Sequence, residues 1–235
     1  MECLSCCEKV DSISLKNIKL VVVDLDGTLY DLSRIIRRIY ELQVDFFSSE
    51  KKMSKERVTE LFKDNCIFPY VTKESKSATE FFLQSGIDNK RWTRCRNEYD
   101  YIMDIVPEKT INQELISMLK LNYKVILLSS NTLQNVFRTL EKIAINKDVF
   151  DKIICSNENK NAFQKDNCLR EYCLYQKINT DEVLSIGDRY QTDIMPLVKL
   201  GAIGVWLKKP KFFSSLTKDI MSLCLRSGEE YEVYI

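Results

Sequence analysis

The chain has 235 residues, of which 45% are hydrophobic and 29% charged, and its formal net charge is +1. This length and composition are typical of a globular protein with one large or two small domains. A nearly neutral chain has no long-range attraction to nucleic acid or to an anionic membrane. The sequence contains no histidine, which excludes Ser-His-Asp and Cys-His catalysis and zinc sites built on imidazole.

No apolar run approaches the roughly 20 residues that a membrane-spanning helix needs. The N-terminus also lacks a basic start followed by an apolar stretch, so we expect a soluble cytoplasmic protein. Residues 1–17 are expected to form a polar arm. Cys3, Cys6 and Cys7 lie in this arm; a zinc site there would need a fourth ligand, and exposed reduced thiols are the favoured interpretation.

The first strand is predicted over residues 18–24, because Val21-Val22-Val23 forms a β-branched run typical of a strand buried on both faces. It leads directly into Asp24 and Asp26. Alternation along a strand points these two carboxylates to the same side, where they repel unless a cation or a shared proton intervenes. The pair is therefore a candidate for a metal or acid/base site. The alternative is that the two acids cap a helix beginning near Leu32.

Helical periodicity dominates the next part of the chain and predicts helices over residues 32–47, 54–62, 75–84 and 89–103. No convincing strand occurs between residues 31 and 106. This stretch therefore interrupts the βα alternation and is predicted to be an inserted helical subdomain.

After Pro107 strands and helices alternate. Helices are expected over residues 111–119, 133–145, 166–176 and 190–200, and strands over residues 124–128, 152–155, 181–186 and 202–207. The predicted fold is an α/β, doubly wound, Rossmann-like parallel sheet, with residues 18–30 and 107–207 as its core. Residues 208–235 are expected to form a C-terminal extension with a basic loop and a helix over residues 214–225.

Three predicted strand ends carry polar side chains: Asp24 and Asp26, Ser130 and Asn131, and Gly187-Asp188 followed by Asp193. Ligands in α/β sheets bind at this edge. In order and element type these segments resemble motifs one, two and four of the haloacid dehalogenase superfamily of phosphohydrolases. Motif one is Asp24-Leu25-Asp26-Gly27-Thr28, and the resemblance covers about residues 19–207.

The third motif of that family is a lysine before the last acidic strand. Lys165 and Lys160 both qualify, and Lys165 is favoured because it begins a predicted helix. The family usually has proline after this lysine, whereas Asp166 follows Lys165 and Asn161 follows Lys160.

The resemblance implies a role for each matched residue. Asp24 is at the position of the nucleophile that forms an aspartyl-phosphate, and Asp26 is at that of the general acid and base. Mg²⁺ is the implied cofactor, because it prefers oxygen ligands. Its implied site uses Asp24, Asp26 through its carbonyl, and Asp188, with Asp193 in support. The implied phosphate-binding residues are Ser130 and Lys165, with Thr28 and Asn131 in support.

The insert would determine the substrate. The separation of Asp26 and Ser130 is 104 positions (130 minus 26), whereas a plain strand-helix-strand unit needs about 30. The surplus resembles the family's helical C1-type cap, loosely that of pyrimidine 5'-nucleotidase-like members. We expect a phosphatase acting on a small phosphorylated metabolite, such as a nucleoside monophosphate or a sugar phosphate. A phosphomutase of the same superfamily and a non-catalytic binding protein remain alternatives, and the sequence makes no prediction of oligomeric state.

Overall fold

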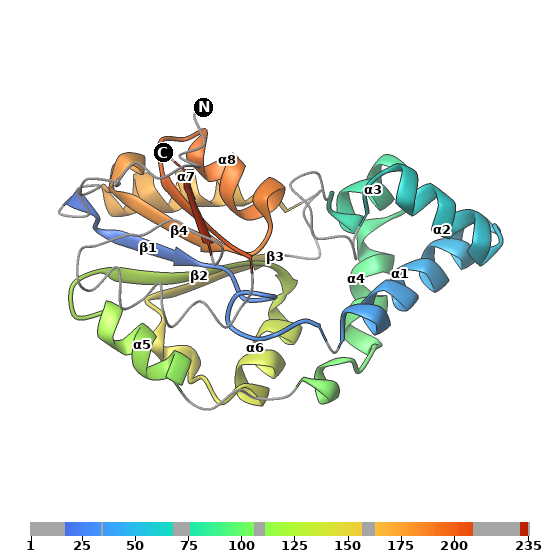
Figure 1. Ribbon diagram of the computed structural model, residues 1–235, viewed down its shortest axis with the longest axis horizontal. Helices are drawn as coiled ribbons and strands as arrows, with labels where there is room; N and C mark the ends of the chain where they lie inside the picture. The colour runs from blue at the N-terminus through green and yellow to red at the C-terminus, as the bar shows by residue number, and fades with distance from the viewer. Residues whose placement is uncertain are drawn as a thin grey trace.

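The protein is described by a computed structural model covering residues 17–33, 35–67, 76–105, 111–156, 163–208 and 231–234. A six-stranded sheet with the order β3-β2-β1-β4-β5-β6 forms its centre (Figure 1). The strands are β1 (Leu20–Val23), β2 (Lys124–Thr132), β3 (Lys152–Ser156), β4 (Val183–Gly187), β5 (Ile203–Leu207) and β6 (Tyr231–Tyr234). The first five are parallel and β6 pairs antiparallel with β5. The predicted doubly wound α/β fold is confirmed.

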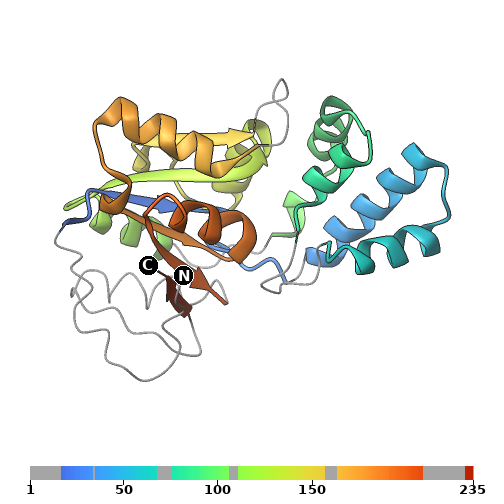
Figure 2. The ribbon, with the colours of Figure 1, turned by 90° about the horizontal axis from the view of Figure 1, so that it is seen from above.

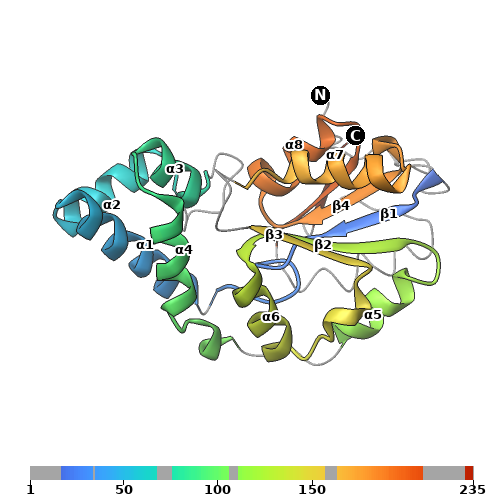
Figure 3. The ribbon, with the colours of Figure 1, turned by 180° about the vertical axis from the view of Figure 1, so that it is seen from behind.

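Helices cover both faces of the sheet (Figures 1 and 3). On one face α5 (Ile111–Leu119) and α6 (Leu133–Lys142) pack against Val21 and Val23 of β1. On the other face α7 (Lys165–Gln176) and α8 (Met195–Val198) pack against Leu20 and Val22. All four residues of β1 are buried, and each such side chain contributes about 1.5–3 kcal/mol through burial. The β-branched run thus holds β1 at the centre of the sheet, with its end near the middle of the carboxyl edge.

Four helices form a separate group beyond the carboxyl edge of the sheet (Figure 2). They are α1 (Ile36–Lys51), α2 (Lys55–Asp64), α3 (Ala78–Gln84) and α4 (Asn89–Glu98), and we call them the helical lobe. The lobe has its own hydrophobic core, in which Phe47, Phe62, Phe82 and Trp92 are buried. Ser54, Ser77 and Asp88 cap α2, α3 and α4, since each side chain accepts a backbone hydrogen bond from the first turn.

Several predicted boundaries differ from the structure. α1 begins at Ile36 rather than Leu32, with Ile35 at its N-cap position and no capping side chain from the described residues. The proposal that Asp24 and Asp26 cap this helix is therefore wrong. The segment expected as one helix over residues 190–200 is a π-helical turn, Tyr190–Ile194, followed by the short α8.

The C-terminal segment contains a strand that was not predicted. β6 extends the sheet by pairing with β5. The predicted helix over residues 214–225 and the cysteine-containing arm lie outside the described residues. Across the described ranges, no helix is long and apolar enough to cross a membrane.

Candidate active site

The predicted site residues meet at the carboxyl edge of the sheet. Because β1, β2 and β4 are adjacent and parallel, the polar segments that follow them open into one cavity of about 110 Å³. Seven of the eight predicted site residues line it: Asp24, Asp26, Ser130, Asn131, Lys165, Asp188 and Asp193. The opposite wall is formed by the lobe, including Gln43 of α1 and Trp92 and Arg96 of α4.

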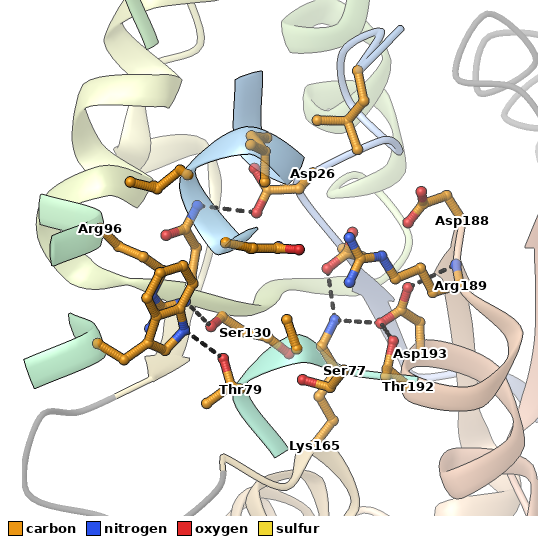
Figure 4. Close-up of a pocket in the computed structure, with 18 of the residues that line it drawn as sticks. Asp26, Ser77, Thr79, Arg96, Ser130, Lys165, Asp188, Arg189, Thr192 and Asp193 are labelled. Carbon is orange, nitrogen blue, oxygen red and sulfur yellow. Dashed lines mark hydrogen bonds and ion pairs between the residues drawn. The ribbon is translucent and has the colours of Figure 1, made fainter. Parts of the chain in front are cut away.

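Three carboxylates and one lysine form the centre of the site (Figure 4). Asp24, Asp188 and Asp193 are buried, and their carboxylate oxygens lie within 4.8 Å of one another. The Nζ atom of Lys165, at the start of α7, is 2.6 Å from Asp24 Oδ1 and 2.8 Å from Asp193 Oδ1. The structure thus brings Lys165 into the site, whereas Lys160 lies outside the described residues.

The two glycines of the acidic motifs permit this close packing. Gly27 has a φ of +85°, and a Cβ atom there would lie 2.1 Å from Asp188 Oδ2. A Cβ atom at Gly187 would lie 2.4 Å from the Cβ of Asp193. Only glycine therefore allows the backbone to approach the carboxylates at these positions.

The cluster carries more negative charge than Lys165 balances. Burial, opposed by Lys165 and reinforced by Asp193 and Asp26, raises the pKa of Asp24 to about 7. Burial and Asp193 also raise the pKa of Asp188 well above its usual range. Asp188 Oδ1 is buried and has no hydrogen-bond partner among the residues that the structure describes. A further cation would satisfy this oxygen and favour the ionised carboxylates.

The donor set fits a hard divalent cation such as Mg²⁺, which prefers carboxylate oxygens. Asp188 is the best placed of the three acids, because its Oδ1 has no partner among the described residues. Asp24 accepts two hydrogen bonds, from Lys165 and Thr28. Asp193 accepts three: its Oδ1 from Lys165 and Thr192, and its Oδ2 from the backbone N–H of Arg189 at 2.9 Å. These contacts suit the predicted supporting position of Asp193, which stays a prediction.

Asp26 is held in a different way. Tyr30 Oη donates to its Oδ1 at 2.5 Å, and Asn131 Nδ2 donates to its Oδ2 at 3.1 Å. The same Asn131 amide donates to Tyr101 Oη at 3.1 Å. Burial is the main cause that raises the pKa of Tyr30 and brings that of Tyr101 to about 12, so both phenols stay protonated and neutral near pH 7. Two donors therefore fix the direction of the Asp26 carboxylate.

The serine and threonine residues near the site differ in their exposure to solvent. Ser130 is exposed at the tip of β2, whereas its neighbour Ser129 is buried and accepts a hydrogen bond from the Asn131 backbone at 3.1 Å. Thr28 is fully buried and donates to Asp24 Oδ2 at 3.3 Å. The structure thus places the Thr28 hydroxyl against Asp24 rather than at the cavity wall, and its predicted supporting role in phosphate binding stays a prediction.

Sequence reasoning missed Tyr30, Tyr101 and Arg96. Tyr30 follows Asp26 by four residues, which is a weak local signal. Tyr101 and Arg96 lie in the predicted helical insert, and nothing in their spacing indicates that they reach the strand ends. Their place at the site depends on how the lobe packs on the sheet.

Comparison with known proteins agrees with the fold and shows the family. The family model described as haloacid dehalogenase-like hydrolase matches residues 21–202, which is most of the chain. The chain therefore belongs to the haloacid dehalogenase-like hydrolase family. No match is found among the curated proteins.

Solved structures share the fold at low sequence identity. A haloacid dehalogenase-like family hydrolase from Xanthomonas campestris superposes with a TM-score of 0.52 at 15% identity, covering 88% of this chain and 94% of that one. A HAD phosphatase from Thermococcus onnurineus gives a TM-score of 0.51 at 21% identity, covering 81% of this chain and 86% of that one. At these identities the likeness concerns the fold alone.

Proposed function

We propose that this hydrolase is a Mg²⁺-dependent phosphatase that acts on a small phosphorylated metabolite through an aspartyl-phosphate on Asp24. The observation that carries the proposal is the buried cluster of Asp24, Asp188, Asp193 and Lys165 at the strand ends. Phosphoryl transfer needs little covalent help from a protein beyond a positioned nucleophile and compensating positive charge. The cluster supplies a nucleophile, a fixed ammonium group and carboxylates suited to a metal ion.

Each residue has a defined task in this proposal. The Asp24 carboxylate attacks phosphorus, and the bond to the leaving oxygen breaks as Asp26 gives it a proton. Asp26 then accepts a proton from the water that attacks the aspartyl-phosphate, which releases inorganic phosphate and restores Asp24. Lys165 and the exposed Ser130 hydroxyl bind phosphoryl oxygens. Asp24 and Asp188 would hold Mg²⁺, which when bound supplies the charge that lets two anions approach.

The lobe is proposed to act as the cap over this site, with residues 31–106 as the inserted domain. Residues from α1 and α4 line the same cavity as the aspartates. A lobe in this position excludes water and contacts the leaving group. The cavity of about 110 Å³ is smaller than the roughly 300–1,000 Å³ of sites for drug-sized ligands. This size supports a substrate smaller than a nucleotide.

The test is phosphate release from a panel of small phosphomonoesters, with Mg²⁺ and with excess chelator. We expect release by the wild-type protein only with Mg²⁺, and a loss of about 10³-fold or more in Asp24→Asn, which removes the nucleophile. Equal release by wild type and Asp24→Asn contradicts the proposal. Formation of an isomerised sugar phosphate instead of free phosphate identifies a mutase.

A further inference from the structure

Within the described ranges, two residues on the lobe side of the cavity have buried polar atoms without a hydrogen-bond partner. Arg96 Nε and Nη2, at the end of α4, and Gln43 Oε1, on α1, have no hydrogen-bond partner within the part of the chain that the structure describes. Gln43 is 6% exposed, and both residues line the cavity that contains the aspartates. Buried polar groups are usually satisfied. Their lack of partners here indicates that a ligand completes this wall.

The position of Arg96 is fixed by the core. Asn135 Nδ2 of α6 donates to the Arg96 carbonyl oxygen at 3.2 Å, and Thr132 Oγ1 donates to Asn97 Oδ1 at 2.5 Å. The guanidinium group lies 5.5 Å from the ring centre of Trp92 and donates through Nη1 to the Ser130 carbonyl oxygen at 3.3 Å. The remaining nitrogens are therefore held in place, which lowers the entropic cost of binding.

Among the residues that the structure describes, no acid forms a direct ion pair with Arg96. Arginine stays protonated in proteins, and a buried charge is costly unless it is paired. Asp26 is the acid whose negative charge interacts with the guanidinium group of Arg96. Both of its oxygens, however, already accept hydrogen bonds, from Tyr30 and Asn131. An anion in the cavity would supply the missing partner for the guanidinium group.

Arg96 does not occupy the side of the cavity where the phosphoryl group would react. Figure 4 shows Arg96 on the opposite side of the cavity from Asp188 and Asp193, with Ser130 nearer to Arg96. In the proposed mechanism the phosphoryl group lies beside Asp24 Oδ1 and Lys165 Nζ, which are 2.6 Å apart, and against the Ser130 hydroxyl. Arg96 contacts the far side of Ser130 through its carbonyl oxygen, so the leaving alcohol, which extends from the phosphoryl group past Ser130, is the part of the substrate that reaches it.

We propose that Arg96 binds a second anionic group, a carboxylate or a phosphate, carried by the leaving alcohol. Gln43 Oε1 accepts a hydrogen bond from a hydroxyl or amino group of the same alcohol. This inference rests on the proposed phosphatase function and narrows its substrate class to small phosphomonoesters with an additional negative charge. Arg96 is a specificity-determining residue in this account, since its planar donor fork matches both kinds of anion.

The experiment compares substrates that differ in one anionic group. 3-Phosphoglycerate is paired with glycerol 3-phosphate, and propane-1,3-diyl bisphosphate with 3-hydroxypropyl phosphate. We expect wild-type kcat/KM to favour the anionic member of at least one pair by about tenfold or more, and the preferred pair distinguishes a carboxylate from a phosphate. Arg96→Gln should remove this preference, and Arg96→Lys should retain part of it. Arg94→Gln, which removes an exposed arginine from the same helix, should leave it unchanged.

A binding measurement tests the anion site independently of phosphatase activity. Calorimetric titration of Asp24→Asn with the same pairs measures the preference without turnover, and Asp24→Asn/Arg96→Gln should lose it. If Asp24→Asn shows a preference in Kd but the wild-type protein releases no phosphate, the phosphatase proposal is refuted and the anion site is retained. Phosphate release without any wild-type preference overturns the anion site. An equal loss of kcat/KM for both members of each pair in Arg96→Gln overturns it too, because that result assigns Arg96 to the packing of α4.

Discussion

At the scale of single residues, Asp24 and Asp26 are separated by one position and yet have different surroundings. Asp24 lies in the carboxylate cluster beside Lys165, with Thr28 behind it. Asp26 is held by neutral donors from Tyr30 and Asn131. Two acids of the same type can acquire different tasks when their environments differ in this way. In the proposed mechanism Asp24 attacks and binds the metal ion, and Asp26 transfers the proton.

This division of tasks predicts how Asp26→Asn will behave. A general acid contributes about 10²–10⁴-fold to the rate, and its contribution grows with the basicity of the leaving group. We expect kcat to fall by that order for alkyl phosphates and by much less for 4-nitrophenyl phosphate, whose leaving group needs no proton. Steady-state kinetics with both substrates provides the measurement. A uniform loss across leaving groups would argue that Asp26 only positions other residues.

Tyr30→Phe is the matched control for the position of Asp26. It removes the donor to Asp26 Oδ1 and keeps the buried ring. We expect a loss of activity smaller than that of Asp26→Asn, because Asn131 still holds the other oxygen. A loss in Tyr30→Phe as large as that in Asp26→Asn would show that the phenol itself takes part in the chemistry.

At the scale of elements, the sequence predicts best the parts where a local pattern determines the outcome. β1 follows from its β-branched run, α5 from its amphipathic spacing, and the start of α2 from Ser54, which caps it. The acidic strand ends could be predicted to meet because parallel strands share a carboxyl edge. This geometric rule is the reason that most of the candidate site is visible in the sequence.

Other elements depend on contacts between distant segments. β6 pairs with β5 across a long gap in the sequence, and no local pattern specifies that pairing. Arg96 and Tyr101 reach the site because hydrogen bonds from Asn135 and Asn131 connect their segment to the core. Thr28 is a similar case. Its position in the first motif predicts that it lies at the site, but only the fold shows that its hydroxyl contacts Asp24.

The four helices of the lobe have their own hydrophobic core, so we expect the lobe to be able to unfold while the sheet stays folded. Phe82 is 1% exposed and packs against Phe46, Phe47 and Trp92 at ring-centre distances of 5.7, 5.4 and 4.9 Å. Phe82→Ala should cost the lobe about 3–5 kcal/mol. We expect amide hydrogen exchange to accelerate in α1–α4 and to change little in β1–β5. Equal acceleration in both regions would show that the lobe and the sheet unfold as one unit.

At the scale of the whole molecule, a net charge of +1 conceals a strongly anionic interior at one edge of the sheet. The near neutrality of the chain predicts no long-range attraction to polyanions, but it says nothing about this local excess. The fold gathers buried carboxylates where the lobe meets the sheet. This excess of negative charge lowers the stability of the folded protein, and the proposed metal ion would offset the loss.

This excess predicts a pH dependence of stability in the metal-free protein. The pKa of Asp24 is raised from an ordinary 3.8 to about 7, so the folded state binds a proton more tightly than the unfolded chain. The stabilisation from this proton binding is fully present below about pH 4 and is lost as pH rises through about 7. Between these pH values we expect the urea midpoint of Asp24→Asn to rise relative to that of the wild type. A constant difference between the two proteins would contradict the assignment.

Mg²⁺ should reverse this effect because it binds the ionised carboxylates of the folded state. The wild-type urea midpoint should rise with Mg²⁺, more at about pH 8 than at about pH 5. Asp188→Asn should abolish most of the increase. NaCl at the same ionic strength serves as a control for general ionic effects. A midpoint that is insensitive to Mg²⁺ at both pH values would contradict a metal site at this cluster.

The central claim, that Asp24 is the nucleophile, has a direct chemical test. The reaction is quenched with acid during turnover, the protein is treated with borohydride, and its peptides are sequenced by mass spectrometry. Borohydride reduces an acyl phosphate to the alcohol, so phosphorylation of Asp24 predicts homoserine at position 24, dependent on both substrate and Mg²⁺. Homoserine at position 26, 188 or 193 in place of position 24 would contradict the account.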